Sequence, residues 1–152
     1  MRKLMIMAVL AAVFASPLAA LADPQGTPDQ AKALVEKAAT LLQQEGKDKA
    51  FAAFDDPHGA FVNGDLYIFV NQMDGTTVAH GTNKALIGKN LVNLKDADGK
   101  FFVQEIISVA KAKGEGWVDY KWPNPLSKKV EAKSSFVKKV GDYVIGCGIY
   151  KG

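Results

Sequence analysis

The sequence predicts an α+β domain in which a long N-terminal helix packs on an antiparallel sheet of about five strands, together with a second helix. Apolar residues recur at helical spacing from Ala31 to Leu42. Five later segments have the composition or alternation of strands. Two tight turns, at residues 73–76 and 141–142, join consecutive strands, and short turns of this kind make strands antiparallel.

The first helix has a clear start and stop. Thr27 is placed to cap it, Pro28 suits the first helical position, and Gln30 stands three residues after the cap. Gly46 is a plausible end. Residues 48–54 favour a second, short helical stretch that ends before Pro57.

Residues 65–70 are β-branched and aromatic, which is typical of a strand. Leu66, Ile68 and Val70 fall on one face, and Tyr67 and Phe69 fall on the other. Since both faces are apolar, we expect the strand to be covered on both sides. The Asp-Gly pair in residues 73–76 predicts a hairpin turn, and residues 77–80 return as the partner strand.

An irregular connection over residues 81–94 leads toward a helix from about Phe101 to Lys113, with Gly114 as its stop. Asp96, Asp98 and Glu105 partly imitate a calcium loop. Leu94 would then occupy the first ligand position, where it cannot bind the ion. We therefore favour helix capping by an Asp and expect no metal and no cofactor.

Three further strands are predicted after this helix. They cover residues 116–122, 130–140 and 143–150.

The N-terminus has the pattern of a secretory signal peptide. A basic start, an apolar run over residues 4–15 and a small-residue site at 20–22 predict cleavage after Ala22. Residues 23–152 then form a single domain of a secreted protein. The chain has 19 Lys and Arg against 16 Asp and Glu, and its sole arginine, Arg2, falls in the leader. This near-neutral balance gives no reason to expect a nucleic-acid partner.

Cys147 is the single cysteine, so no intrachain disulfide is possible. We interpret it as a small buried hydrophobe, with a reactive thiol or a dimer crosslink as the alternative.

The residues show no complete catalytic set, and His58 is interpreted as a turn residue. A small enzyme that uses His80 and Cys147 stays open as an alternative function, and so does an interaction module without a ligand.

A set of aromatic and polar residues suggests a pocket for a small anionic ligand. A carboxylate needs a cation, one or two hydrogen-bonding groups and apolar walls. The cation and polar groups would be Lys133, Ser135, His80 and Tyr67, and the walls would be Trp117, Tyr120, Trp122 and Phe69. The alternative from the pattern alone is that the aromatics fill a core and that Lys133 is solvated at a sheet edge.

Several motifs, taken in order, resemble the single Cache domain, type 2. The resemblance runs from about Ala31 to Lys151, and its motifs are Asp65-Leu66-Tyr67-Ile68-Phe69-Val70, Asp74-Gly75-Thr76, Ala79-His80-Gly81, Leu86-Ile87-Gly88-Lys89-Asn90, Asp96-Ala97-Asp98-Gly99-Lys100, Gly116-Trp117-Val118-Asp119-Tyr120, Trp122-Pro123-Asn124-Pro125, Lys133-Ser134 and Gly146-Cys147-Gly148-Ile149-Tyr150.

The resemblance implies a PAS-like sheet with a ligand pocket on its concave side. It implies a bacterial, periplasmic sensor of small organic acids, with His80, Lys133 and the aromatics of residues 116–122 as candidate ligand contacts. The sequence departs from the family pattern at Lys84, where the family often has proline, and at Cys147. Because no membrane-spanning or kinase region follows the matched segment, we expect a free binding protein, monomer or homodimer. The alternatives are that it hands its ligand to a partner, such as a membrane receptor or kinase, or that it serves another purpose.

Overall fold

In the computed structural model, residues 25–152 are described; the predicted signal peptide lies outside them. Within this range, two helices, α1 (Pro28–Glu45) and α2 (Lys47–Phe54), precede the sheet, and α3 (Phe102–Lys113) interrupts it. The strands are β1 (Val62–Asn63), β2 (Leu66–Tyr67), β3 (Phe69–Gln72), β4 (Thr77–His80), β5 (Glu115–Pro123), β6 (Val130–Val140) and β7 (Tyr143–Tyr150). A short 3₁₀ turn, η1, covers Lys84–Leu86. None of the helices in this range is long and apolar enough to span a membrane.

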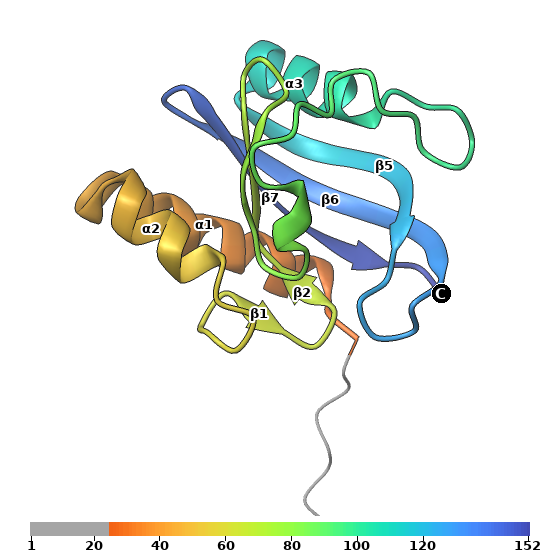
Figure 1. The fold of residues 1–152 in the computed structure, drawn as a ribbon, viewed down its shortest axis with the longest axis horizontal. Helices are drawn as coiled ribbons and strands as arrows, with labels where there is room; N and C mark the ends of the chain where they lie inside the picture. Colours follow the sequence, from red (N-terminus) through yellow and green to blue (C-terminus); the bar gives the residue numbers. More distant parts are fainter. Residues whose placement is uncertain (1–24) are drawn as a thin grey trace, which may run out of the picture.

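The main sheet has five strands in the order β4-β3-β7-β6-β5, and every pair is antiparallel. The α+β prediction is therefore confirmed. The last strand lies at the centre, because β7 pairs with β6 on one side and with the early strand β3 on the other. This pairing brings Phe69 of the first hairpin beside Gly146 near the end of the chain. Figure 1 shows the sheet with α1 and α2 to one side and α3 above it.

The predicted cap of α1 is confirmed. Thr27 Oγ1 accepts a hydrogen bond from the Gln30 amide at 3.3 Å, and Gln30 Oε1 accepts one from the Thr27 amide at 2.9 Å. Gly46 ends the helix with a positive φ of 80°. The first amides of a helix have no partner within the helix, so each hydrogen bond from the cap avoids the cost of an unpaired N–H group.

Replacement of Thr27 by Ala removes one of these reciprocal bonds. We expect the free energy of unfolding to fall by about 1 kcal/mol. Urea denaturation followed by circular dichroism will measure it. Thr40→Ala, in the exposed middle of the same helix, is a matched control, and an equal loss there would show that the cap contributes nothing specific.

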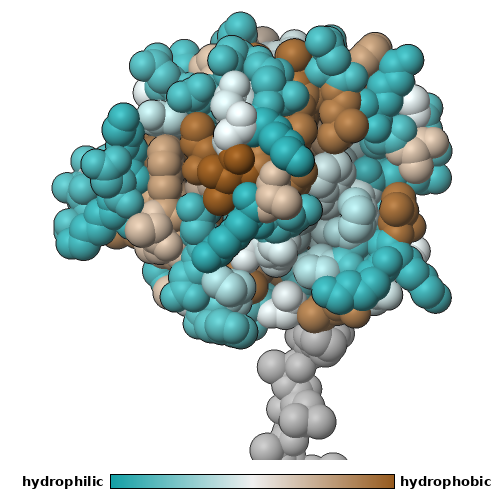
Figure 2. All heavy atoms as spheres, in the orientation of Figure 1, coloured by the Kyte–Doolittle hydropathy of each residue, from teal (hydrophilic) through white to brown (hydrophobic). Residues whose placement is uncertain are grey.

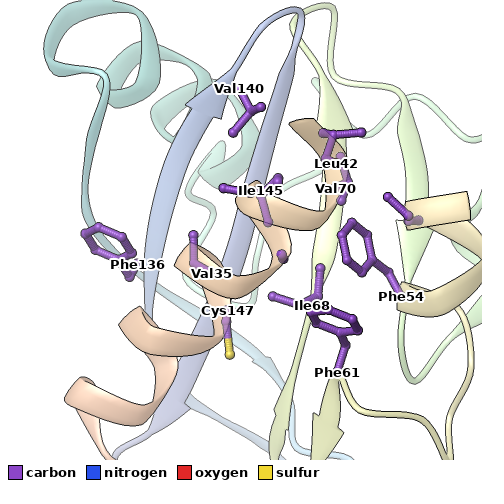
Figure 3. Packing of buried hydrophobic residues seen from close by; sticks show 14 of the residues in the cluster. Val35, Leu42, Phe54, Phe61, Ile68, Val70, Phe136, Val140, Ile145 and Cys147 are labelled. Atoms are coloured by element: carbon purple, nitrogen blue, oxygen red, sulfur yellow. The ribbon is translucent and has the colours of Figure 1, made fainter. Parts of the chain in front are cut away.

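Each face of the sheet has its own core. On one face, α1 and α2 pack on residues that include Ile68, Val70, Ile145 and Cys147 (Figure 3). On the other face, α3 packs on Tyr67, Phe69, Val118 and their neighbours. The predicted split of residues 66–70 between two apolar faces is confirmed, because alternate residues of this segment belong to different cores.

Two local expectations are corrected. Residues 65–70 do not form one continuous strand, because Leu66–Tyr67 turn aside to pair with β1 and only Phe69–Gln72 join the main sheet. The helix α3 is not capped by an Asp, since its cap position is Phe101 and no side chain bonds there. Asp96 lies too far upstream and instead accepts bonds from the backbone amides of Asp98, Lys100 and Lys121.

The long connection between β4 and α3 crosses the same face of the sheet as α3 (Figure 1, green). It carries exposed apolar side chains at Ile87, Leu94 and Phe101. Figure 2 shows brown apolar patches on this face, surrounded by hydrophilic surface. The connection and α3 together form the cover of the site described next.

Candidate functional site

An inner cavity lies between the sheet and its cover of α3 and the β4–α3 connection. It leaves about 20 Å³ to a water-sized sphere, which is room for about one water molecule. Strands β2 to β6, the β4–α3 connection and α3 contribute to its wall. The lining residues are Tyr67, Phe69, Asn71, Thr77, His80, Leu86, Leu91, Phe102, Val103, Ile106, Tyr120, Trp122 and Lys133.

Lys133 is the one cation in this wall. It is 1% exposed and lies on β6, opposite Tyr120 of β5 and Tyr150 of β7. Its Nζ donates a hydrogen bond to Tyr67 Oη at 2.8 Å. Nζ takes part in none of the ion pairs found among residues 25–152. A buried ammonium with one protein acceptor has hydrogen-bonding capacity left for an anion.

Four aromatic rings surround the Lys133 ammonium. Its Nζ lies 4.1 Å from the ring centroid of Tyr67, 5.2 Å from Tyr150, 5.4 Å from Phe69 and 5.9 Å from Tyr120. Rings at these distances attract a cation through their negative faces. This aromatic cage partly offsets the cost of taking the ammonium out of water.

Two glycines of β7 make the room for these side chains. A Cβ at Gly148 would lie 2.4 Å from Lys133 Cε, and a Cβ at Gly146 would lie 2.2 Å from Phe69 Cζ. Side chains from the flanking strands therefore extend across β7 where it has none of its own. Glycine within a strand often marks such a close approach of a neighbouring group to the backbone.

A directed chain of hydrogen bonds holds the ammonium. Tyr150 Oη donates to the Pro123 carbonyl at 2.8 Å, so its contact of 3.2 Å with Tyr67 Oη must be one in which Tyr67 donates. Tyr67 Oη is thereby left to accept from Lys133. Lys133 therefore donates to Tyr67, Tyr67 donates to Tyr150, and Tyr150 donates to the Pro123 carbonyl, so that each of the two hydroxyl groups donates one hydrogen bond.

Burial sets the protonation of these groups. It lowers the pKa of the Lys133 ammonium to about 7, against the opposing effects of Cys147 and Asp65. It also raises the pKa of Tyr67 and Tyr120 well above the usual phenol range. The phenols therefore stay neutral, while the charge of Lys133 changes near physiological pH.

His80 is a neutral hydrogen-bond donor to the cavity. Its Nδ1 accepts bonds from the backbone amides of Asn83 at 3.0 Å and Thr82 at 3.3 Å, which leaves the proton on Nε2. Burial and the nearby Lys133 charge lower the pKa of His80 to about 3. The imidazole therefore keeps one N–H and no charge across the physiological range.

An irregularity in the first hairpin brings His80 to this face. The register between β3 and β4 shifts at Val70/Asn71, so Asn71 pairs with Thr77 while Phe69 pairs with His80. Residues three apart on a regular strand would point to opposite faces. Because of the shift, both Thr77 and His80 line the cavity.

The structure brings six predicted site residues to the cavity: Tyr67, Phe69, His80, Tyr120, Trp122 and Lys133. Ser135 lies one step behind the wall, where its hydroxyl contacts Tyr120 Oη at 2.9 Å. Trp117 does not line the cavity, which corrects the expectation for this residue. It lies on the opposite face of β5, is 42% exposed and packs on Phe136, as alternation along the strand requires.

His80 and Cys147 are not assembled into a reactive pair. Cys147 is fully buried on the α1 face of β7 (Figure 3). His80 lines the cavity on the other face of the sheet. Burial raises the pKa of the Cys147 thiol to about 12. The interpretation of this cysteine as a buried small hydrophobe is confirmed.

Two parts of the cavity wall were not predicted from the sequence: the polar pair Asn71 and Thr77, and the covering residues that include Phe102. Asn71 Nδ2 donates to Thr77 Oγ1 at 3.1 Å. Phe102 stacks on Tyr120 with ring centroids 4.7 Å apart. The face of Tyr67 and Phe69, extended by two residues, would have included Asn71, but nothing local indicated that Leu86 and Leu91 close the cavity.

The family model for the Cache domain matches residues 11–151 of this sequence. The chain belongs to the Cache domain family. The predicted resemblance is confirmed. Among the solved structures it is similar to a periplasmic sensor domain of a chemotaxis protein, with 31% identity and a TM-score of 0.67 over 82% of this chain and 90% of that one.

A second structure, of a Cache chemosensory domain described for its carboxylic acid recognition, shares the fold. Its TM-score is 0.73 at 23% identity, over 82% of this chain and 92% of that one. Longer relatives contain a similar segment. The sensor histidine kinase MctS of Rhizobium johnstonii is 36% identical over 88 residues, 57% of this chain and 19% of the kinase.

The methyl-accepting chemotaxis protein McpP of Pseudomonas putida is 26% identical over 118 residues, 76% of this chain and 21% of the receptor. This Cache domain therefore spans about a fifth of the length of these two relatives. It is related to the sensor parts of chemotaxis proteins and histidine kinases.

Proposed function

We propose that the protein is a periplasmic sensor domain that binds small organic acids and acts by binding, not catalysis. The observation that carries this proposal is the Lys133 ammonium, 1% exposed, in the wall of the inner cavity. Burying a charge is costly unless a partner compensates it. A carboxylate from solution is the partner that fits a cation with free N–H groups.

His80 supports a carboxylate ligand in particular. Its Nε2–H is a neutral donor, and a carboxylate oxygen accepts from such a donor without a second charge in the site. The rings of Tyr67, Tyr120 and Trp122 offer apolar contact to a short carbon chain. Ser135, through its contact with Tyr120, is proposed to position that wall.

The ligand must displace part of the cover of the inner cavity. A space of about 20 Å³ is smaller than any organic acid, so binding requires side chains of the cover to move. The relatives favour the same class of function, since one structural neighbour recognises carboxylic acids and others belong to chemotaxis proteins and kinases. We propose that a membrane receptor or kinase receives the signal.

Binding should depend on pH through Lys133. A carboxylate needs the charged ammonium, whose pKa in the unliganded protein is about 7. Affinity should therefore be full below about pH 6 and should fall by about tenfold or more by about pH 8.5. His80 stays neutral over this window and adds no second transition.

Isothermal titration calorimetry with acetate, propionate, pyruvate and lactate will test the proposal. We expect at least one of them to bind more tightly than about 1 mM, or about 4 kcal/mol. Above pH 7, binding should take up a proton, which is measured by repeating the titration in buffers of different ionisation enthalpy. Affinity independent of pH would exclude Lys133 as the anion site.

A further inference from the structure

A second hollow, the outer pocket, adjoins the inner cavity. It leaves about 220 Å³ to a water-sized sphere and is lined by His80, Thr82, Asn83, Trp122, Pro123, Asn124, Pro125 and Lys128. His80 and Trp122 line both spaces. These two side chains therefore belong to the walls of both hollows.

The loop of residues 124–129 holds Lys128 at the outer pocket in an unusual conformation. Lys128 has a φ of 61°, and it is the one non-glycine residue with positive φ among residues 25–152. A side chain with a Cβ is strained in this region. The loop is nevertheless well tied, because the Lys128 amide donates to the Asn124 carbonyl at 2.9 Å and the Asn124 amide donates to the Lys129 carbonyl at 2.8 Å.

The charges at this pocket favour an anion. Lys128 is the one charged residue in its lining, and it joins none of the ion pairs found in the described range. Glu131, which belongs to β6 and does not line the pocket, accepts hydrogen bonds from Asn124 Nδ2 at 2.9 Å and from Ser127 Oγ at 2.5 Å. Strain that persists beside a pocket points to a functional role for the strained residue.

The volumes indicate how a ligand divides between the hollows. The inner cavity accepts little more than one polar group beside Lys133. Trp122, which lines both hollows, is half-buried and packs on Phe102 with ring centroids 5.1 Å apart. The space beyond Trp122 is the outer pocket.

We propose that the two hollows form one site for a small dicarboxylate, with one carboxylate on Lys133 and the other on Lys128. This inference rests on the proposed function, since it takes Lys133 as the first anion site. It adds the substrate class: an acid with an anionic group at each end is preferred over a monocarboxylate of equal length. Asn83 and Thr82 supply polar contacts beside the second carboxylate.

The test compares succinate with butyrate, which have four carbons each and differ in the second carboxylate. Calorimetry on the whole chain should show succinate bound at least tenfold more tightly. Lys128→Gly should remove this advantage and leave butyrate affinity unchanged. Because glycine tolerates positive φ, the same variant should have an equal or higher Tm, so a folding defect cannot explain the loss.

Lys129→Ala, at the next and equally exposed position, is the matched control and should keep the preference for succinate. Equal binding of succinate and butyrate by the unaltered protein would overturn the inference. So would an equal loss of both ligands in Lys128→Gly, which would assign Lys128 to general attraction of anions. If the protein binds neither these acids nor the shorter ones, the proposed function itself fails.

Discussion

Replacement of Lys133 by Met should abolish binding of small carboxylates while leaving the fold intact. Removing one partner of a buried charge pair costs about 2–5 kcal/mol, so affinity should fall by a factor on the order of 100. Met has a similar length and fills the space between the aromatic rings. Tyr67 keeps its hydrogen bond to Tyr150, so the hydroxyl chain survives the change.

Calorimetry at about pH 6, where Lys133 is charged, gives the largest contrast between the two proteins. Lys139→Met is the matched control, because Lys139 is exposed on the same strand. An unchanged affinity in Lys133→Met would remove Lys133 from the site. A loss of equal size in Lys139→Met would show that the ligand responds only to net charge.

The same substitution has a predictable effect on stability. The folded-state pKa of Lys133, about 7, lies below its unfolded value near 10.5, so the unfolded state binds more protons between these values. Stability of the unaltered protein should therefore rise with pH across this window. Below pH 7 the full cost of the buried charge is present, and Lys133→Met should be the more stable protein there. Thermal denaturation of both proteins at several pH values will measure how the difference between their Tm values changes with pH.

Much of the fold follows from short-range chemistry. Thr27, Pro28 and Gln30 define the start of α1 because backbone amides at a helix end need acceptors. Strand alternation predicts that Tyr67 and Phe69 share one face of the sheet, and the structure places both on the cavity face. The same alternation places Trp117 and Tyr120 on opposite faces of β5, and the structure shows Trp117 on the face away from the cavity.

The rest of the site depends on long-range pairing. Lys133 is caged because β7 lies between β3 and β6, an order that no local pattern specifies. His80 reaches the same face through a register shift, which moves side chains by one position without a clear sequence signal. The strained backbone of Lys128 is equally hidden, since lysine has no preference for positive φ.

Gly148 links this long-range order to function. It pairs with Ser135 on β6, and the missing side chain is what lets Lys133 extend over β7 toward Tyr67. A methyl group there would lie 2.4 Å from Lys133 Cε and from Ser135 Oγ. The lysine chain is flexible and can yield, whereas the backbone of a central strand cannot. The conflict therefore resolves by displacing the ammonium from its cage.

Gly148→Ala should thus weaken carboxylate binding by at least tenfold and lower the free energy of unfolding by about 1–3 kcal/mol, as overpacked cores do. Gly116→Ala is the matched control. It is also a strand glycine, and its Cβ would lie 2.8 Å from Val109 Cγ1, away from the cavity lining. A comparable loss of stability with unchanged affinity is expected in that variant. The alanine methyl group and Lys133 Cε cannot occupy the same space. Full affinity in Gly148→Ala would therefore mean that Lys133 binds its ligand from a position outside the aromatic cage.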